Sequence, residues 1–383
     1  MKRNLLTFAL LVAPVIGCGS SSPEPVAPTD SAATPPPADT AATAAPTPAP
    51  TTPPKAEPTP EEKKKAEQAK NLAEDRAKME AEAKTEAARW TPELRAEAKK
   101  LAETKYPTVD AALKAALAGK HRKPGNADRD KHRHPAETLK FLGLKPTMTV
   151  IEYNPGDGWY TELLAPTLAA QGKLLVAGFD PNGPREVRST LYGEMLKLFL
   201  DKSPELYGKV ERLAVDPKKL QFNQEGTADM VLAFRVLHNM HRDKLMATFL
   251  AEVHKALKPN GVFGVEQHRA KADANPDDTA KQGYLPEAFV ISQVEAAGFK
   301  LAGKSEVNAN PKDTKDYAEG VWVLPPTLAL GDKDKDKYAA IGESDRMTLK
   351  FVKVAAKGAA GAAAPAGGAG AAGGAGAAGA TKK

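Results

Sequence analysis

The sequence of 383 residues contains one cysteine, Cys18, and aromatic residues make up only 6% of it. A single cysteine excludes an intramolecular disulfide, a cysteine-ligated zinc site and thiol catalysis, so the fold must depend on its apolar core. Dense charge of one sign is also lacking, because 54 Lys and Arg against 48 Asp and Glu leave a net charge of +6. Without a basic stripe carrying interleaved aromatic residues, we expect no nucleic-acid partner.

Residues 1–17 are predicted to be a signal peptide rather than part of the fold. The apolar stretch over residues 5–16 is too short to span a bilayer as a helix. It ends in Val15-Ile16-Gly17-Cys18, which resembles the lipobox of bacterial lipoproteins and implies lipid attachment at Cys18. The alternative is an ordinary secretion signal with an incidental cysteine. We therefore expect an exported protein anchored by lipid to the bacterial envelope, and Gly19 favours the outer membrane, facing the periplasm.

Composition divides the rest of the chain into four segments. Residues 18–60 are rich in Pro, Ala and Thr and are predicted to be a disordered tether, because they bury too little apolar surface to fold. Residues 61–119 are a charged helical segment, in which 61–105 either is a solvated helical stretch with i,i+4 charge pairs or binds a helical partner. Residues 120–354 are the folded domain, and the Gly/Ala-rich residues 355–383 are a disordered tail.

Strands and helices alternate from residue 148 onward, which predicts a parallel α/β sheet covered by helices on both faces. The predicted strands are 148–152, 173–179, 209–215, 229–234, 262–267, 299–307 and 347–354. The predicted helices between them are 159–170, 184–200, 242–257 and 285–297. The segment 308–343 is long for a connection between two strands and is a candidate substrate lid.

The most informative stretch is Glu152-Tyr153-Asn154-Pro155-Gly156-Asp157-Gly158. It follows the first predicted strand and precedes a helix predicted to begin near Trp159. An acidic strand end followed by a glycine turn and a helix is typical of a loop whose backbone contacts a small ligand. A plain strand–helix turn in another kind of α/β protein is the alternative.

These residues resemble the class I S-adenosylmethionine-dependent methyltransferases, in particular a group of exported bacterial predicted methyltransferases that is uncharacterised. The resemblance covers residues 120–353. It is carried by the stretches 129–138, 152–161, 234–239, 257–261 and 267–270. It implies a Rossmann-like seven-stranded sheet in the order 3-2-1-4-5-7-6, with strand 7 antiparallel.

The resemblance also implies S-adenosylmethionine as the cofactor and assigns residues to it. The family loop reads acidic-x-Gly-x-Gly-x-Gly; Glu152, Gly156 and Gly158 match it, whereas Asn154 replaces the first glycine. Asparagine is the least costly substitute for glycine where a positive φ is needed. Asp180, at the end of the second strand, would accept hydrogen bonds from the ribose hydroxyls, and capping a helix is its alternative role.

Four more residues complete the candidate site. By the resemblance, Asp216 would bond the adenine amino group, unless it only shapes the turn with Pro217. His238 and Asn239 follow the fourth strand and His268 the fifth, on the side of the sheet where ligands bind. A histidine there can take a proton from an attacking hydroxyl, so we expect His238, then His268, to be the catalytic base. Bracing a helix start is the alternative for each histidine.

Two histidine pairs, His238 with His241 and His132 with His134, have the spacing of half a metal site, but neither contains the Glu of the zinc-protease pattern, so we expect no metal. No Asn-Pro-Pro-Tyr motif follows the fourth strand, which argues against methylation of DNA bases. The predicted function is therefore methyl transfer to a small molecule or a cell-envelope component. The alternatives are a non-catalytic envelope protein with a degenerate fold and a nucleotide-dependent oxidoreductase.

Overall fold

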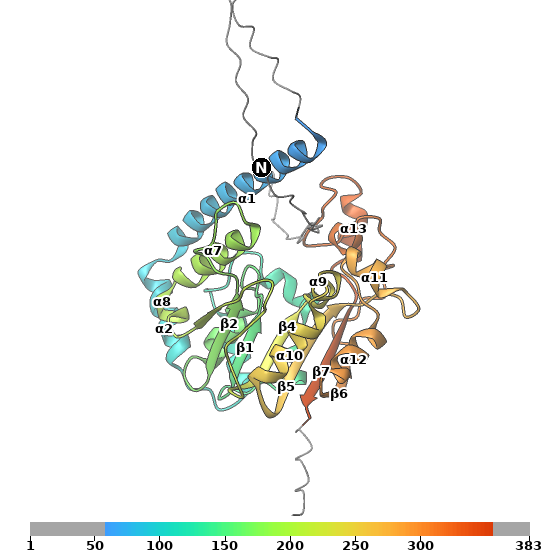
Figure 1. The fold of residues 1–383 in the computed structure, drawn as a ribbon. Helices are drawn as coiled ribbons and strands as arrows, with labels where there is room; N and C mark the ends of the chain where they lie inside the picture. Colours follow the sequence, from blue (N-terminus) through green and yellow to red (C-terminus); the bar gives the residue numbers. More distant parts are fainter. Residues whose placement is uncertain (1–57, 355–383) are drawn as a thin grey trace, which may run out of the picture.

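A computed structural model of the chain describes residues 58–354 (Figure 1). The predicted signal peptide, Cys18, the tether up to residue 57 and the tail 355–383 lie outside the described residues. Across residues 58–354, no helix has both the length and the apolar character needed to cross a membrane.

Seven strands form one sheet, and their pairing confirms the predicted fold. The strands are β1 (Thr149–Tyr153), β2 (Lys173–Gly178), β3 (Glu211–Ala214), β4 (Ala228–Phe234), β5 (Leu257–His268), β6 (Phe299–Ser305) and β7 (Arg346–Lys353). Their order is β3-β2-β1-β4-β5-β7-β6, as expected for a Rossmann-like methyltransferase sheet. The first five strands are parallel, and β7 runs antiparallel between β5 and β6.

Helices cover both faces of the sheet. The α-helices before β4 are α1 (Pro60–Arg89), α2 (Pro92–Glu103), α3 (Val109–Ala118), α4 (Asp130–Arg133), α5 (Pro135–Leu142), α6 (Thr161–Leu168), α7 (Arg188–Asp201) and α8 (Pro204–Tyr207). Those after β4 are α9 (Leu237–Arg242), α10 (Met246–Ala256), α11 (Pro276–Thr279), α12 (Glu287–Ala296) and α13 (Lys335–Ile341). Three short 3-10 helices are η1 (Ala127–Arg129), η2 (Ala280–Gln282) and η3 (Gly320–Val323).

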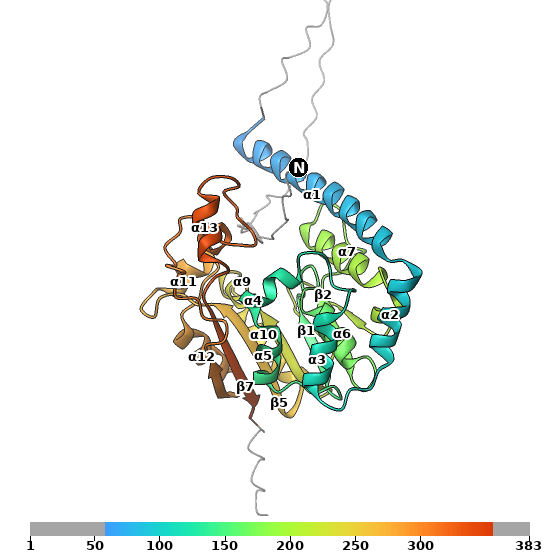
Figure 2. The same ribbon diagram turned by 180° about the vertical axis from the view of Figure 1, so that it is seen from behind.

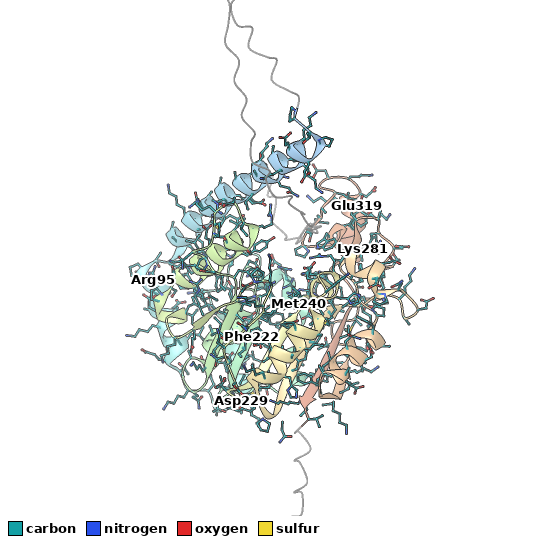
Figure 3. The ribbon with its side chains drawn as sticks, viewed as in Figure 1. Arg95, Phe222, Asp229, Met240, Lys281 and Glu319 are labelled. Atoms are coloured by element: carbon teal, nitrogen blue, oxygen red, sulfur yellow. The ribbon has the colours of Figure 1, made fainter. Side chains whose placement is uncertain are left out.

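The core lies in two layers, one on each face of the sheet. Figure 1 shows α10 in front of β4 and β5, and Figure 2 shows α3, α5 and α6 in front of the opposite face. Phe222 and Met240, both labelled in Figure 3, belong to the layer that α10 covers. The central strand β1 is fully buried at Val150 and Ile151 because both faces are covered.

The helix α1 begins where its sequence provides a complete capping box. The Thr59 hydroxyl accepts a hydrogen bond from the Glu62 amide, and the Thr59 amide donates one to the Glu62 carboxylate. Most of α1 is exposed, as a solvated helix would be, but Leu72 and Met79 pack against Leu191 of α7. Figures 1 and 2 both show α1 lying along α7.

The helix predicted over 242–257 forms as α10, which begins at Met246, and a separate helix that the sequence pattern does not predict, α9, precedes it. Lys244 adopts a left-handed φ of 58° between the two helices. As a result, His238 and Asn239 lie in the first turn of α9 rather than in a loop after β4.

Candidate functional site

A cavity of about 210 Å³ opens at the carboxyl edge of the sheet, next to the ends of β1, β4 and β5. Four parts of the chain contribute to its wall: the loop after β1, the segments after β4 and β5, the helices before β1, and the long connection between β6 and β7. The polar residues of the wall are Arg129, Arg133, Glu152, Asn154, Asp157, Arg235, His238, Asn239, His268, Thr327, Glu343 and Ser344.

The loop after β1 has the backbone conformation that its sequence predicts. Asn154 adopts a φ of 49°, which confirms that asparagine occupies a left-handed position usually held by glycine. Its amide donates a hydrogen bond of 2.8 Å to the Ala177 carbonyl of β2, which fixes the start of the turn. The substitution therefore preserves the loop.

The two glycines of the loop have different roles. Gly156 has a φ of 62°, and a Cβ atom added there would meet no atom within 4 Å, so its backbone faces open space beside the cavity. Gly158 has a φ of 80°, and a Cβ atom there would lie 2.5 Å from the Phe199 ring of α7. Gly158 does not line the cavity, and its conformation instead permits close packing of α7 on the loop.

Glu152 is the acidic group of the cavity wall nearest the start of the loop. It is 3% exposed and accepts a hydrogen bond of 2.7 Å from the Thr161 hydroxyl. Burial raises the pKa of Glu152 to about 7, although the hydrogen bond from Thr161 and the nearby charge of Arg235 oppose that rise. A bound cation would favour the charged carboxylate, so Glu152 is suited to a positively charged ligand.

Arg235 directly follows β4 and has a strained conformation. Its φ is 59°, which costs a bulky L-residue about 1–2 kcal/mol. Its amide donates a hydrogen bond to the Glu266 carbonyl of β5, and its guanidinium donates one of 2.8 Å to the Glu266 carboxylate. The Tyr160 hydroxyl donates another to the same carboxylate at 2.9 Å, so Glu266 lies behind the wall and holds Arg235 in place.

A second cluster of charges centres on Glu343. Its carboxylate lies within 2.9 Å of the guanidinium nitrogens of Arg129, Arg133 and Arg346. Burial would raise the pKa of Glu343, but the three guanidinium groups outweigh it and hold that pKa well below its usual range. Arg133 also lies over the Trp159 ring, 4.7 Å from its centroid. The segment before the sheet thus contributes Arg129 and Arg133 to the cavity wall.

The two predicted base candidates face each other in the cavity wall. The rings of His238 and His268 have centroids 5.9 Å apart. His238 contacts the Gln267 side chain through Nδ1, and His268 contacts the Ser344 hydroxyl through Nδ1 at 2.6 Å. Burial lowers the pKa of His238 to about 4 and that of His268 well below its usual value. Both histidines are therefore neutral at pH 7 and can accept a proton.

Asn239 completes the polar wall next to His238. Its side chain is 8% exposed, and its Oδ1 atom has no hydrogen-bond partner among the described residues. An unpaired buried oxygen costs about 1–3 kcal/mol unless a ligand donates to it. Asn239 lines the cavity, so a small movement of its side chain would let Oδ1 accept a hydrogen bond from a bound molecule.

The predicted lid segment supplies the apolar part of the wall. The side chains of Val321, Trp322, Pro325 and Pro326 line the cavity. Trp322 lies 6.3 Å from His238, measured between ring centroids. The segment 308–343 therefore covers the cavity from the side of β7.

Two smaller hollows continue from the cavity along the loop toward β2. The first is lined by Asn154 and Gly156, which it shares with the cavity, and by Phe179 and residues of α7. The second, of about 180 Å³, shares Phe179 with the first and reaches Asp180. The cavity and the two hollows thus form a row that runs from Glu152 to the Asp180 carboxylate, just after β2. Because an extended adenosyl group needs such a row, the residues present fit S-adenosylmethionine.

The two remaining predicted contacts differ in position. Asp180 lines the last hollow, although its carboxylate also accepts a hydrogen bond from the Asn182 amide in a turn. Asp216 lines none of the three hollows, and its carboxylate accepts a hydrogen bond from the Lys218 amide. This hydrogen bond favours the role of Asp216 in shaping the turn, and a contact between Asp216 and adenine stays a prediction.

Some residues of the site carry little signal in the sequence. Glu343, Ser344 and Trp322 come from the long connection before β7, which no motif marks. The run Glu343-Ser344-Asp345-Arg346, a polar group directly before a buried strand, is the one signal that points to them. Arg269, next to His268, pairs with Glu287, Glu306 and Asp345 and does not line the cavity. Within residues 58–354, no three His, Cys, Asp or Glu side chains gather as a metal site.

Comparison with known proteins agrees with this geometry. Residues 127–301 match the family model described as a methyltransferase domain. Together with the strand order, this match supports a methyltransferase domain with a Rossmann-like sheet. No curated protein matches the chain.

Solved structures of methyltransferases align with part of the chain. A SAM-dependent methyltransferase from Aquifex aeolicus is 18% identical, with a TM-score of 0.38, over 65% of this chain and 100% of that one. The 1,6-didemethyltoxoflavin-N1-methyltransferase of Burkholderia thailandensis, with bound S-adenosylhomocysteine, is 17% identical, with a TM-score of 0.36, over 59% and 78%. The N-methyltransferase NodS of Bradyrhizobium japonicum is 14% identical, with a TM-score of 0.38, over 61% and 99%.

Proposed function

We propose that the protein transfers a methyl group from S-adenosylmethionine to a small molecule or a component of the cell envelope. The observation that carries this proposal is the row of hollows from Asp180 to Glu152, which ends in a cavity with two neutral histidines. When bound, S-adenosylmethionine supplies an electrophilic methyl group at a sulfonium centre. The carboxylate of Glu152 lies at the end of the row where that positive charge is expected.

The chain's own side chains supply the remaining requirements of the reaction. Methyl transfer needs an aligned nucleophile, a dry site and, for an oxygen nucleophile, a base. Trp322 and the two prolines beside it exclude water from one side of the cavity. We assign proton removal to His238 or His268, because both are neutral and share the wall with the unpaired Asn239 oxygen.

The test uses S-adenosylmethionine labelled in its methyl group, incubated with the protein and a small-molecule and envelope-lipid extract. We expect label to move into the extract. The changes His238→Ala and His268→Ala should both lower methyl transfer. The histidine that acts as the general base should show a loss of roughly 10²–10⁴-fold, and a histidine that only positions the acceptor should show a modest loss. Binding of S-adenosylhomocysteine, measured separately, should stay within about threefold.

The matched control is His241→Ala on the same helix. His241 pairs with Asp277 and does not line the cavity, so this change should leave transfer unchanged. Binding of the cofactor without any transfer to the extract would instead favour the alternative, a non-catalytic envelope protein that kept the fold. The left-handed Asn154 does not support that alternative, because the loop keeps its shape.

We also propose that the protein is exported and lipid-anchored at Cys18. The motivation is the basic N-terminus, the short apolar stretch and the Val15-Ile16-Gly17-Cys18 sequence. Mass spectrometry of the mature protein should find a lipid-modified Cys18 at its N-terminus, and Cys18→Ser should release the protein from membranes. A mature chain that begins at Met1 would contradict this proposal.

A further inference from the structure

The charges of the cavity wall are divided between two sides. The loop after β1 presents the carboxylates of Glu152 and Asp157. Guanidinium groups of Arg129, Arg133 and Arg235 line the rest of the wall. A cationic ligand group is therefore favoured at the loop, and an anionic group is favoured at the arginines.

The basic side carries more positive charge than its own carboxylates neutralise. Four arginines belong to it, because Arg346 lies directly behind the wall and contacts both buried carboxylates. Among residues 58–354, two carboxylates, Glu266 and Glu343, pair with these four guanidinium groups. Glu152 and Asp157 lie at the loop in the same cavity wall, but at the basic side itself two guanidinium charges exceed the carboxylates in contact with them. Buried charges are normally paired, so this local excess favours anionic ligand groups at the basic side.

The cofactor accounts for at most part of this excess. The methionine end of S-adenosylmethionine carries one carboxylate, and its ammonium and sulfonium groups make the whole molecule a cation. Its carboxylate therefore neutralises one of the two excess charges, while its net charge makes the loaded cavity more positive. A second anionic group, from the acceptor, is needed to complete the pairing.

Arg235 is the arginine best placed to bind that second group. It follows β4 directly, one turn of chain before His238, and its charge contributes to the lowered pKa values of both His238 and His268. It also holds a left-handed φ of 59° that glycine would adopt without strain. A strained arginine at the rim of a cavity is typical of a side chain that the site requires.

We propose that the methyl acceptor is an anion whose carboxylate or phosphate group pairs with Arg235, beside the His238–His268 pair. The hydroxyl or amino group to be methylated then lies beside the His238–His268 pair, which takes its proton, and next to Asn239. The anion also offsets the charge of Arg235 next to the two histidines, which makes each a stronger base. This inference rests on the methyltransferase function proposed above.

The test is calorimetric and uses the full chain saturated with S-adenosylhomocysteine. Inorganic phosphate and acetate are titrated in separate experiments, with uncharged glycerol as the negative control. We expect at least one of the two anions to bind saturably. Tighter binding of phosphate assigns a phosphorylated acceptor, and tighter binding of acetate assigns a carboxylic acid.

The variants separate Arg235 from general charge effects. Arg235→Gln should weaken anion binding at least about tenfold, because charge-assisted hydrogen bonds are lost. Arg235→Lys, which keeps the charge, should weaken it less. Arg95→Gln on α2, labelled at the edge of the molecule in Figure 3, removes an arginine away from the cavity and should change nothing.

A second variant keeps the test decisive if Arg235→Gln fails to fold. Arg129→Gln leaves Glu343 paired with Arg133 and Arg346, so its fold should survive, and it should also weaken anion binding. Anion binding that disappears when S-adenosylhomocysteine is bound would overturn the inference, because the anion would then occupy the place of the cofactor's own carboxylate. No anion binding to the S-adenosylhomocysteine complex would overturn it as well. Absence of S-adenosylhomocysteine binding is a different result and would overturn the proposed function itself.

Discussion

Titration of the Glu152 carboxyl should make the affinity for the cofactor depend on pH. Its pKa of about 7 lies above the ordinary carboxyl value of 4.5, so part of the cofactor-free protein is protonated there at neutral pH. A bound sulfonium favours the carboxylate, so binding releases a proton and strengthens as pH rises through 7. We expect the affinity for S-adenosylmethionine to increase about tenfold between pH 6 and pH 8.

Calorimetric titration at several pH values measures this dependence. Glu152→Gln removes the titrating group while keeping the side-chain shape and one acceptor for Thr161. Its affinity for S-adenosylmethionine should be weaker at pH 8 and nearly independent of pH. A wild-type affinity that is flat between pH 6 and pH 8 would show that Glu152 does not meet the cation.

Asn154 tests the backbone argument for the loop. Because its φ of 49° is easy for glycine and costly for a β-branched residue, Asn154→Gly should leave stability and cofactor affinity nearly unchanged. Asn154→Val should lower the free energy of unfolding by about 1–2 kcal/mol. Urea unfolding measures both, and equal stability of the two variants would contradict the strained turn.

The contact between α7 and the end of β2 is the element-scale feature on which the row of hollows depends. A Cβ atom at Gly193 would lie 2.5 Å from the Phe179 carbonyl oxygen and 2.7 Å from the Asp180 carbonyl carbon. Gly193→Ala should therefore move α7 away from β2 and cost about 1–3 kcal/mol of stability. It should also weaken S-adenosylhomocysteine binding, since Phe179 and Asp180 line the outer hollow.

The control for this variant is Leu198→Ala, an exposed position of the same helix. Thermal unfolding and a binding titration should show little change for it. If Gly193→Ala bound S-adenosylhomocysteine as tightly as the wild type, the close approach of α7 would have no part in shaping the site.

The elements that the sequence predicts well are those with a strong local pattern. The strand β1 and the loop from Glu152 to Gly158 combine an apolar run with a glycine turn, and both form where expected. The break between α9 and α10 has no such pattern, because Lys244 is a residue that rarely adopts a left-handed φ. We infer that tertiary packing of both helices on the sheet sets the position of this break, and a short stretch of sequence carries no information about such packing.

At the scale of the whole molecule, a buried lysine links the N-terminal helices to the domain. Lys202, at the end of α7, lies 3.4 Å from Glu86 of α1 and 3.6 Å from Glu162 of α6. Burial lowers the pKa of Lys202, although both carboxylates oppose that shift. Lys202→Gln leaves the buried Glu162 and the half-buried Glu86 without this partner and should lower the free energy of unfolding by about 3–5 kcal/mol.

Lys197→Gln on the same helix is the matched control, since Lys197 pairs with Asp201 at a half-exposed position. Its effect should stay below about 1 kcal/mol. Denaturant unfolding compares the two variants. Equal stability would mean that α1 is not coupled to the domain through Lys202.

The whole fold was more predictable than the whole site. Alternation of apolar runs and helical segments predicts the strands and a parallel sheet. The order β3-β2-β1-β4-β5-β7-β6 and the antiparallel β7 follow from the family resemblance, and the structure confirms both. The arginine cluster around Glu343 joins residues from the first and last parts of the domain, more than two hundred positions apart. No pattern in the sequence reports such a pairing, because it arises only when β7 returns between β5 and β6.

The central claim is that the hollows beside the Glu152–Gly158 loop hold an adenosyl cofactor. Calorimetric titration of the full chain with S-adenosylhomocysteine tests it most directly. We predict saturable binding of one molecule per chain, weakened about tenfold or more by Asp180→Ala because a charged acceptor for the ribose is lost. No heat of binding at millimolar ligand would contradict the claim and leave the fold without its cofactor.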